Sequence, residues 1–148
     1  MSNKTVGKPL TMDLVFTKTK SDSLQNIKNL NLWGNDLDDI TIVNQMNALE
    51  VLSLSVNHIQ TLKDVQYCYN LRELYLRKNL IANIQEVKYL QNLRKLRKLW
   101  LGENPVADVP MYRLIVIKLL PQVEVLDNVP ITADEIDRAQ SIDAEELD

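Results

Sequence analysis

Few residues in this sequence could carry out catalysis or bind a metal. The 148-residue chain contains one histidine, His58, and one cysteine, Cys68. A metal site or a nucleophile–base pair needs several such residues at set spacings, and neither has a matching partner along the chain. We expect His58 to be a surface turn residue and Cys68 to be buried and unreactive. A glycine-rich phosphate loop and a nucleophile elbow are also missing, so the sequence predicts no enzyme, no cofactor and no metal.

Binding to another protein is the chemistry that the remaining side chains could support. Tryptophan, tyrosine and arginine contribute most often to the energy of protein interfaces, particularly where small neighbours leave room for a partner. Six residues of these kinds, together with the basic Lys98 at the expected rim, form the candidate protein-binding site: Trp33, Ser53, Ser55, Tyr75, Arg77, Lys98 and Trp100. The elements that carry them decide which of these residues lie together.

Four internal repeats set the positions of these residues. Asn35, Asn57 and Asn79 are 22 residues apart, and Asn104 follows after 25, which places a three-residue insertion near residues 91–95. Around each asparagine, apolar residues recur in the order L-x-x-L-x-L-x-x-N-x-L, the pattern of leucine-rich repeats. This pattern predicts an α/β solenoid of about four to five leucine-rich repeats with a parallel sheet on its concave side.

Each part of the repeat has its own predicted structure. The alternating leucines suit a short strand with one buried face, and the asparagine is expected to bond backbone groups that the turn would otherwise leave unpaired. Apolar residues then recur every three positions, which suits a 3₁₀ turn on the convex side. Residues between the buried leucines face the concave side, where equivalent positions of adjacent strands lie about 4.8 Å apart. We therefore expect Tyr75 beside Trp100, with Ser53 and Ser55 next to them.

These aromatic residues leave two interpretations open. Tyr75 and Trp100 could form the centre of a protein-binding groove with Arg77 and Lys98 at its rim, or could only stabilise one another as a cross-strand pair. Trp33 could belong to the same groove, or could close the first repeat against the N-terminal cap.

Helices are predicted to cap both ends of the solenoid. Thr11 is the expected N-cap of a helix over residues 12–19. Residues 110–120 predict an amphipathic helix, residues 123–126 a degenerate last strand, and Thr132–Glu135 a capping box that begins a final helix. The predicted domain organisation is a flexible N-terminus at 1–10, a capped leucine-rich-repeat domain at 11–139 and an acidic tail at 140–148.

Charge is distributed unevenly along the chain. The whole sequence has a net charge of −3, but residues 71–101 contain eight basic and two acidic residues and residues 132–148 contain one basic and seven acidic residues. A basic surface could bind an acidic protein, phosphate, RNA or the acidic tails of tubulin, or could be no more than a solvated edge. The negative total charge argues against nucleic acid as the partner.

The single cysteine predicts a reducing compartment, and the lack of a long apolar run predicts no membrane insertion.

Residues outside the repeat consensus point to one family. They lie in Asn31-Leu32-Trp33-Gly34-Asn35, Leu52-Ser53-Leu54-Ser55-Val56-Asn57, Glu73-Leu74-Tyr75-Leu76-Arg77-Lys78-Asn79, Leu99-Trp100-Leu101-Gly102-Glu103-Asn104-Pro105 and Leu126-Asp127-Asn128. With the three-residue insertion, these segments resemble the cilia- and flagella-associated protein 410 family over residues 10–140. The repeats are also similar to the 22-residue class in the regulatory subunit of protein phosphatase 1.

The family resemblance implies a function and a location. It implies a non-enzymatic scaffold of the cytoplasm and cytoskeleton, at the basal body and ciliary base, that supports assembly of cilia or flagella with a NimA-related kinase as partner. It also implies a further C-terminal oligomerisation segment, so we expect this domain to be monomeric and the full-length protein to be oligomeric. The alternative function is a regulatory subunit of a protein phosphatase that binds through the same concave face.

Overall fold

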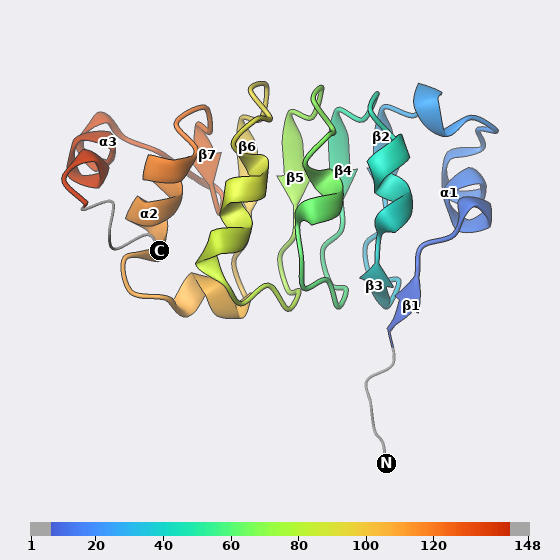
Figure 1. The fold of residues 1–148 in the computed structure, drawn as a ribbon, viewed down its shortest axis with the longest axis horizontal. Coiled ribbons are helices and arrows are strands. Elements are labelled where there is room, and N and C mark those ends of the chain that lie inside the picture. Colours follow the sequence, from blue (N-terminus) through green and yellow to red (C-terminus); the bar gives the residue numbers. More distant parts are fainter. Residues whose placement is uncertain (1–6, 143–148) are drawn as a thin grey trace, which may run out of the picture.

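Short parallel strands line one face of the molecule in the computed structural model, which describes residues 7–142 (Figure 1). They are β2 (Asn29–Asn31), β4 (Val51–Ser53), β5 (Glu73–Tyr75), β6 (Lys98–Trp100) and β7 (Val125–Leu126), followed by the antiparallel β8 (Val129–Pro130). They pair in the order β2-β4-β5-β6-β7-β8, so each repeat adds one strand beside that of the preceding repeat. The predicted leucine-rich-repeat solenoid with a parallel sheet is confirmed.

Short 3₁₀ helices cover the opposite, convex face, as the spacing of three predicted. They are η2 (Thr41–Gln45), η3 (Lys63–Val65) and η4 (Ile84–Leu90). Two further 3₁₀ helices lie outside this series: η1 (Leu24–Asn26) precedes β2, and η5 (Pro105–Asp108) precedes α2. Val43, Val65 and Val87 from successive repeats are fully buried against the leucines of the strands. The core therefore lies between sheet and helices and runs along the whole stack.

Buried asparagine side chains join one repeat to the next. Asn57 Oδ1 accepts hydrogen bonds from two backbone N–H groups of the preceding repeat, at 2.9 and 3.0 Å, and its Nδ2 donates to the carbonyl oxygens of Leu32 and Leu54 at 3.0 and 2.8 Å. Asn79 and Asn104 make equivalent bonds. The predicted bonding of turn backbone groups by these three asparagines is confirmed.

Asn35, the first asparagine of the series, differs from the other three. Its Nδ2 donates to the carbonyl oxygen of Trp33 within the same turn, and its side chain is only partly buried. The reason is its place in the stack, because no complete repeat precedes it whose backbone groups it could bond.

Helices α1 (Met12–Thr19), α2 (Tyr112–Leu119) and α3 (Ala133–Gln140) occupy the two ends of the stack (Figure 1). Thr11 caps α1 by accepting a hydrogen bond from the backbone of Leu14, and Thr132 and Glu135 form the capping box of α3, both as predicted. Val15 of α1 is fully buried, so this helix shields the first repeat.

The structure places two predicted boundaries differently. The N-terminus was predicted to be flexible up to residue 10, but β1 (Lys8–Pro9) pairs in parallel with β3 (Leu37–Asp39), and Leu10 is buried in the core. The domain was predicted to end at residue 139, but Ile142 is also buried, because it follows Ala139 by three residues and so turns to the same side. Residues 1–6, and residues 143–148 of the predicted acidic tail, lie outside the described part of the chain.

Candidate protein-interaction surface

Tyr75 and Trp100 lie side by side at the centre of the concave face. The sheet register pairs Ser53 with Tyr75, and Tyr75 with Trp100. The centres of the two rings are 4.9 Å apart and their planes are inclined by 66°, an edge-to-face arrangement that stabilises aromatic pairs. The predicted juxtaposition of the two residues is confirmed, and the cross-strand pair exists whether or not a partner binds it.

A depression of about 330 Å³ lies beside this pair. The residues that line it are Asn31, Trp33, Ser53, Ser55, Tyr75 and Trp100. The small serine side chains on β4 and in the residues that follow it leave the space, and larger aromatic rings border it. Trp33 is 62% exposed, so it does not close the first repeat against the N-terminal cap. That alternative is wrong, and Trp33 instead contributes apolar surface to the depression.

The hydroxyl group of Tyr75 has a fixed partner. It donates a hydrogen bond to Oε1 of Glu73, two residues earlier on the same strand. Partial burial, with Glu73 as a further cause, raises the pKa of Tyr75 to about 12. The phenol is therefore neutral at physiological pH, and its ring is held in one orientation on the sheet.

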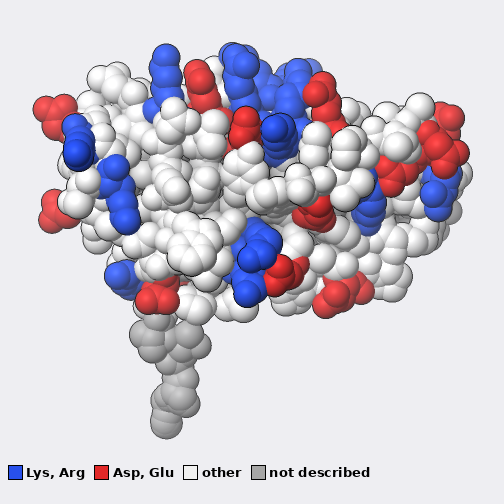
Figure 2. All heavy atoms as spheres, turned by 180° about the vertical axis from the view of Figure 1, so that it is seen from behind, with Lys and Arg blue, Asp and Glu red and all other residues white. Residues whose placement is uncertain are grey.

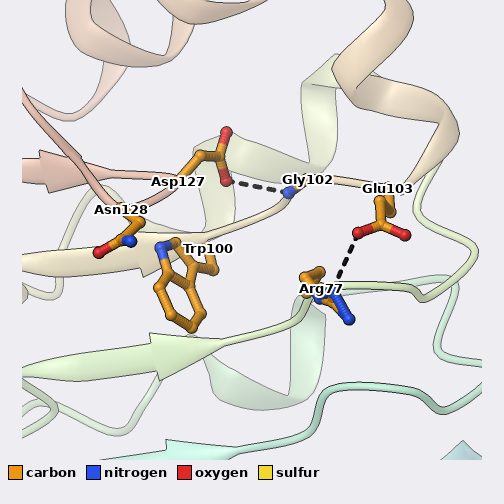
Figure 3. Close-up of a pocket in the computed structure, with 6 residues that line it drawn as sticks. All are labelled: Arg77, Trp100, Gly102, Glu103, Asp127 and Asn128. Carbon is orange, nitrogen blue, oxygen red and sulfur yellow. Dashed lines mark hydrogen bonds and ion pairs between the residues drawn. The ribbon is translucent and has the colours of Figure 1, made fainter.

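A second, larger depression of about 520 Å³ lies on the other side of Trp100 (Figure 3). Its lining consists of Arg77, Trp100, Gly102, Glu103, Asp127 and Asn128. An ion pair of 2.9 Å joins the guanidinium of Arg77 to Glu103, and Lys78 Nζ lies 3.8 Å from the same carboxylate. Trp100 borders both depressions, so together they form one continuous uneven surface.

Asp127 forms the wall of the second depression and is held on both of its oxygens. Oδ1 accepts from the backbone N–H groups of Leu101 and Gly102 at 2.7 and 2.9 Å, and Oδ2 accepts from the Tyr112 hydroxyl at 2.8 Å. Burial and this carboxylate raise the pKa of Tyr112 far above its ordinary value. The side chain therefore connects β6 and α2 and stays fixed.

The seven predicted site residues do not all lie together. Trp33, Ser53, Ser55, Tyr75 and Trp100 line the first depression. Arg77 lines the second, where Glu103 already pairs with it, and Lys98 is exposed at the start of β6 outside both linings.

The candidate site omitted several lining residues. Asn31, Glu103, Asp127 and Asn128 line the depressions but were not predicted as site residues. One signal could have found Asp127, because it follows Asn104 by 23 residues and so occupies the asparagine position of a degenerate last repeat.

The two residues with catalytic chemistry lie outside these depressions. Cys68 is 1% exposed, and burial raises the pKa of its thiol to about 12, which keeps it protonated. His58 follows the turn of the second repeat, with Nε2 3.5 Å from Asp36 Oδ1. Over residues 7–142, we find no cluster of three histidine, cysteine or acidic side chains that could hold a metal ion. No helix in the same range is both long and apolar enough to span a bilayer.

Comparison with known proteins confirms the resemblance drawn from the sequence. The chain is 44% identical over 134 residues to the Homo sapiens protein named cilia- and flagella-associated protein 410, and the match covers 89% of this chain and 52% of that protein. The chain therefore spans about half the length of the curated relatives it matches.

Solved structures share the architecture at lower identity. A chain of the Drosophila melanogaster SNF/U2A′ complex matches with a TM-score of 0.69 at 22% identity, over 90% of this chain and 91% of that one, which shows the fold alone. The Mex67 leucine-rich-repeat domain of Chaetomium thermophilum matches at 26% identity with a TM-score of 0.63, over 86% and 99%. A family model described as leucine-rich repeat matches residues 11–145, a range that includes every repeat and the helices at both ends, and the chain thus belongs to the leucine-rich repeat family.

Proposed function

We propose that this chain is a non-enzymatic protein-interaction module that binds its partner on the concave face of the sheet. The observation that carries the proposal is the depression floored by Ser53 and Ser55 and bordered by Trp33, Tyr75 and Trp100. Large aromatic rings next to small residues are typical of interface centres, where a partner side chain can exclude water. The concave sheet is also the surface that solenoid proteins commonly use for binding.

We further propose that the module acts at the basal body or ciliary base and that its partner is a NimA-related kinase. The support is the 44% identity to a relative whose name associates it with cilia and flagella, together with the family resemblance of the sequence. A protein phosphatase catalytic subunit remains the alternative partner.

Removing the two central rings tests the concave site. We expect Tyr75→Ala combined with Trp100→Ala to weaken capture of a purified NimA-related kinase by at least about thirtyfold, or about 2 kcal/mol, because the pair lies at the centre of the proposed interface. Binding would be measured by surface plasmon resonance with the leucine-rich-repeat chain immobilised. A parallel channel with a phosphatase catalytic subunit distinguishes the two partners.

A matched control comes from an aromatic pair outside both depressions. Tyr67 and Tyr69 are also an edge-to-face aromatic pair, with ring centres 6.3 Å apart, and both are half exposed. Replacing both with alanine removes similar ring area but should leave binding unchanged. Melting curves of each variant must show that the fold persists. If the folded concave variant binds normally while the variant at Tyr67 and Tyr69 does not, the proposed site is in the wrong place.

A further inference from the structure

The two edges of the sheet carry different charge. At the carboxyl ends of the strands, Arg77 and Lys78 share the carboxylate of Glu103. At the amino ends of β5 and β6, basic side chains gather along the upper edge in Figure 2. We call this group the cationic edge, and it consists of Arg72, Arg94, Lys95, Arg97 and Lys98. Apart from Lys88 on η4, the basic residues of the run 71–101 thus divide between these two edges of the sheet.

Two members of the cationic edge are held in place. The Arg97 guanidinium donates to the carbonyl oxygen of Arg94 at 2.8 Å and lies 3.6 Å from Glu124. Lys95 Nζ donates to Asn70 Oδ1 at 2.9 Å. Within the described range, the side chains of Arg72, Arg94 and Lys98 form no hydrogen bond or ion pair, and all three residues are exposed. These three charges are available to a partner.

Acidic residues bracket the cationic edge. Backbone hydrogen bonds of 2.7–2.8 Å link Lys28 to Glu50, Glu50 to Arg72, Arg72 to Arg97, and Arg97 to Glu124. These five residues therefore occupy one position on successive strands, and Glu50 separates Lys28 from the two arginines. Glu50 and Glu124 therefore lie on either side of a cationic stretch only two strands wide. Within the stretch, Glu73 is engaged by the hydroxyl of Tyr75.

We propose that the cationic edge binds a short acidic segment of a partner polypeptide, with two or three carboxylates in sequence. The width of the stretch suits such a segment, since adjacent strands are about 4.8 Å apart. A long polyanion such as RNA, or an anionic membrane surface, would also meet Glu50 and Glu124, which interrupt the positive charge on both sides of the stretch. The chain carries a net charge of −3, so attraction of an acidic peptide must come from this local surface.

The cationic edge adjoins the aromatic pair but does not depend on it. Lys98 pairs with Glu73 in the sheet register and precedes Trp100 by two residues on the same strand. A protein bound on the concave face could therefore extend an acidic segment over this edge. An acidic segment can also bind here when nothing occupies the depressions, which allows the edge to be tested alone.

Peptide titration followed by nuclear magnetic resonance tests this site. The probe is the synthetic peptide Gly-Ser-Glu-Glu-Glu-Ser-Gly, added to isotope-labelled chain at low salt. We expect saturable shifts of backbone amide signals confined to residues 71–74 and 94–99. Arg72→Glu with Lys98→Glu should raise the apparent Kd at least about tenfold, because each reversal replaces an attraction with a repulsion. Both side chains are exposed, so we expect the variant to fold. Well-dispersed amide signals in its spectrum would verify this.

Two controls make the outcome decisive. Lys18→Glu with Lys63→Glu changes the net charge equally at exposed sites elsewhere, and should bind the peptide like the parent. A decauridine RNA and phosphatidylserine vesicles, at equal charge concentration, should bind more weakly than the peptide. The proposal is overturned if the amide shifts spread over the surface, if the control pair loses binding equally, or if RNA or vesicles bind more tightly.

Discussion

The interior turns of the solenoid and its last turn both bond backbone groups with a polar side chain, but the side chain is an asparagine in the interior and an aspartate in the last turn. Asn57, Asn79 and Asn104 bond both N–H and carbonyl groups through neutral amides. In the last turn Asp127 only accepts, from two backbone N–H groups and the Tyr112 hydroxyl. The corresponding interior carbonyl of Leu76 accepts from both Asn79 and Asn104, whereas Asp127 offers no such second donor to the carbonyl oxygen of Leu101, which accepts from Asn104.

The C-terminal cap as a whole depends on charged groups. The Arg113 guanidinium lies 2.6 Å from Glu135 Oε2 and also donates to the carbonyl oxygen of Leu126 at 3.0 Å, so it connects α2, β7 and α3. The interior relies on uncharged amides buried between repeats. The comparison teaches that stability should depend on pH at the end of the stack and much less in its middle.

Removing the C-terminal cap should have the largest effect. A chain that ends before Pro110 loses α2, whose Ile115 and Val116 are buried in the core, and exposes the apolar side of the last full repeat. We expect aggregation or loss of cooperative melting, measured by light scattering and circular dichroism. A chain that ends after Ile142 keeps the cap and should melt like the parent. A soluble, sharply melting short chain would show that the cap is dispensable.

Exchanging asparagine and aspartate between an interior turn and the last turn should have the second largest effect on stability. Asn57→Asp removes the donor that serves the carbonyl oxygen of Leu32 and buries a carboxylate, while Asn79 still donates to the carbonyl of Leu54. We therefore expect a loss of about 2–4 kcal/mol in the free energy of unfolding. The reciprocal change, Asp127→Asn, keeps an acceptor for both N–H groups and should cost less than about 1 kcal/mol. Urea denaturation measures both. Equal losses would mean that the two turns are not chemically distinct.

Acid should weaken the cap selectively, and this is the smallest effect. The ion pair with Arg113, helped by the backbone N–H of Thr132, lowers the pKa of Glu135 from 4.5 to about 2. A lowered pKa stabilises the folded state fully above pH 4.5, and this contribution disappears as the pH falls from 4.5 towards 2. Glu135→Gln should therefore be less stable than the parent at neutral pH, with a difference that shrinks over this range.

A neighbouring carboxylate provides the control for the acid experiment. Asp134 precedes Glu135 on α3, and its side chain is 80% exposed at 3.9 Å from Arg138. Asp134→Asn should leave the pH dependence of unfolding almost unchanged, since exposed pairs contribute little. If both variants track the parent at every pH, the Arg113–Glu135 pair does not stabilise the cap.

The sequence predicted those features that follow from the repeat period. The spacing of the asparagines and the alternation of leucines was enough to place Tyr75 beside Trp100, because parallel strands in register align equivalent residues. The candidate site was incomplete where the repeats end. Asp127 follows the repeat spacing but replaces the consensus asparagine, and Asn128 lies in a turn outside the consensus, so a search for asparagine at the repeat period missed both.

The basic run in the sequence did not show which of its charged side chains lie at which edge of the sheet. Arg72 and Arg77 belong to one basic segment but lie at opposite ends of β5, and only Arg77 meets Glu103 from the next repeat. Pairing between residues 26 apart depends on the turn conformation rather than on the repeat pattern. Leu10 was similarly missed, because it precedes the first periodic segment of the chain.

The backward reach of the asparagines has a consequence for synthesis on the ribosome. Asn57 bonds groups of the first repeat, Asn79 groups of the second, and Asn104 groups of the third. Each repeat therefore completes the hydrogen bonds of the one made just before it, and contacts are formed between neighbours. Folding in the order of translation leaves only the newest repeat with open backbone groups, until Asp127 and α2 emerge and close the stack.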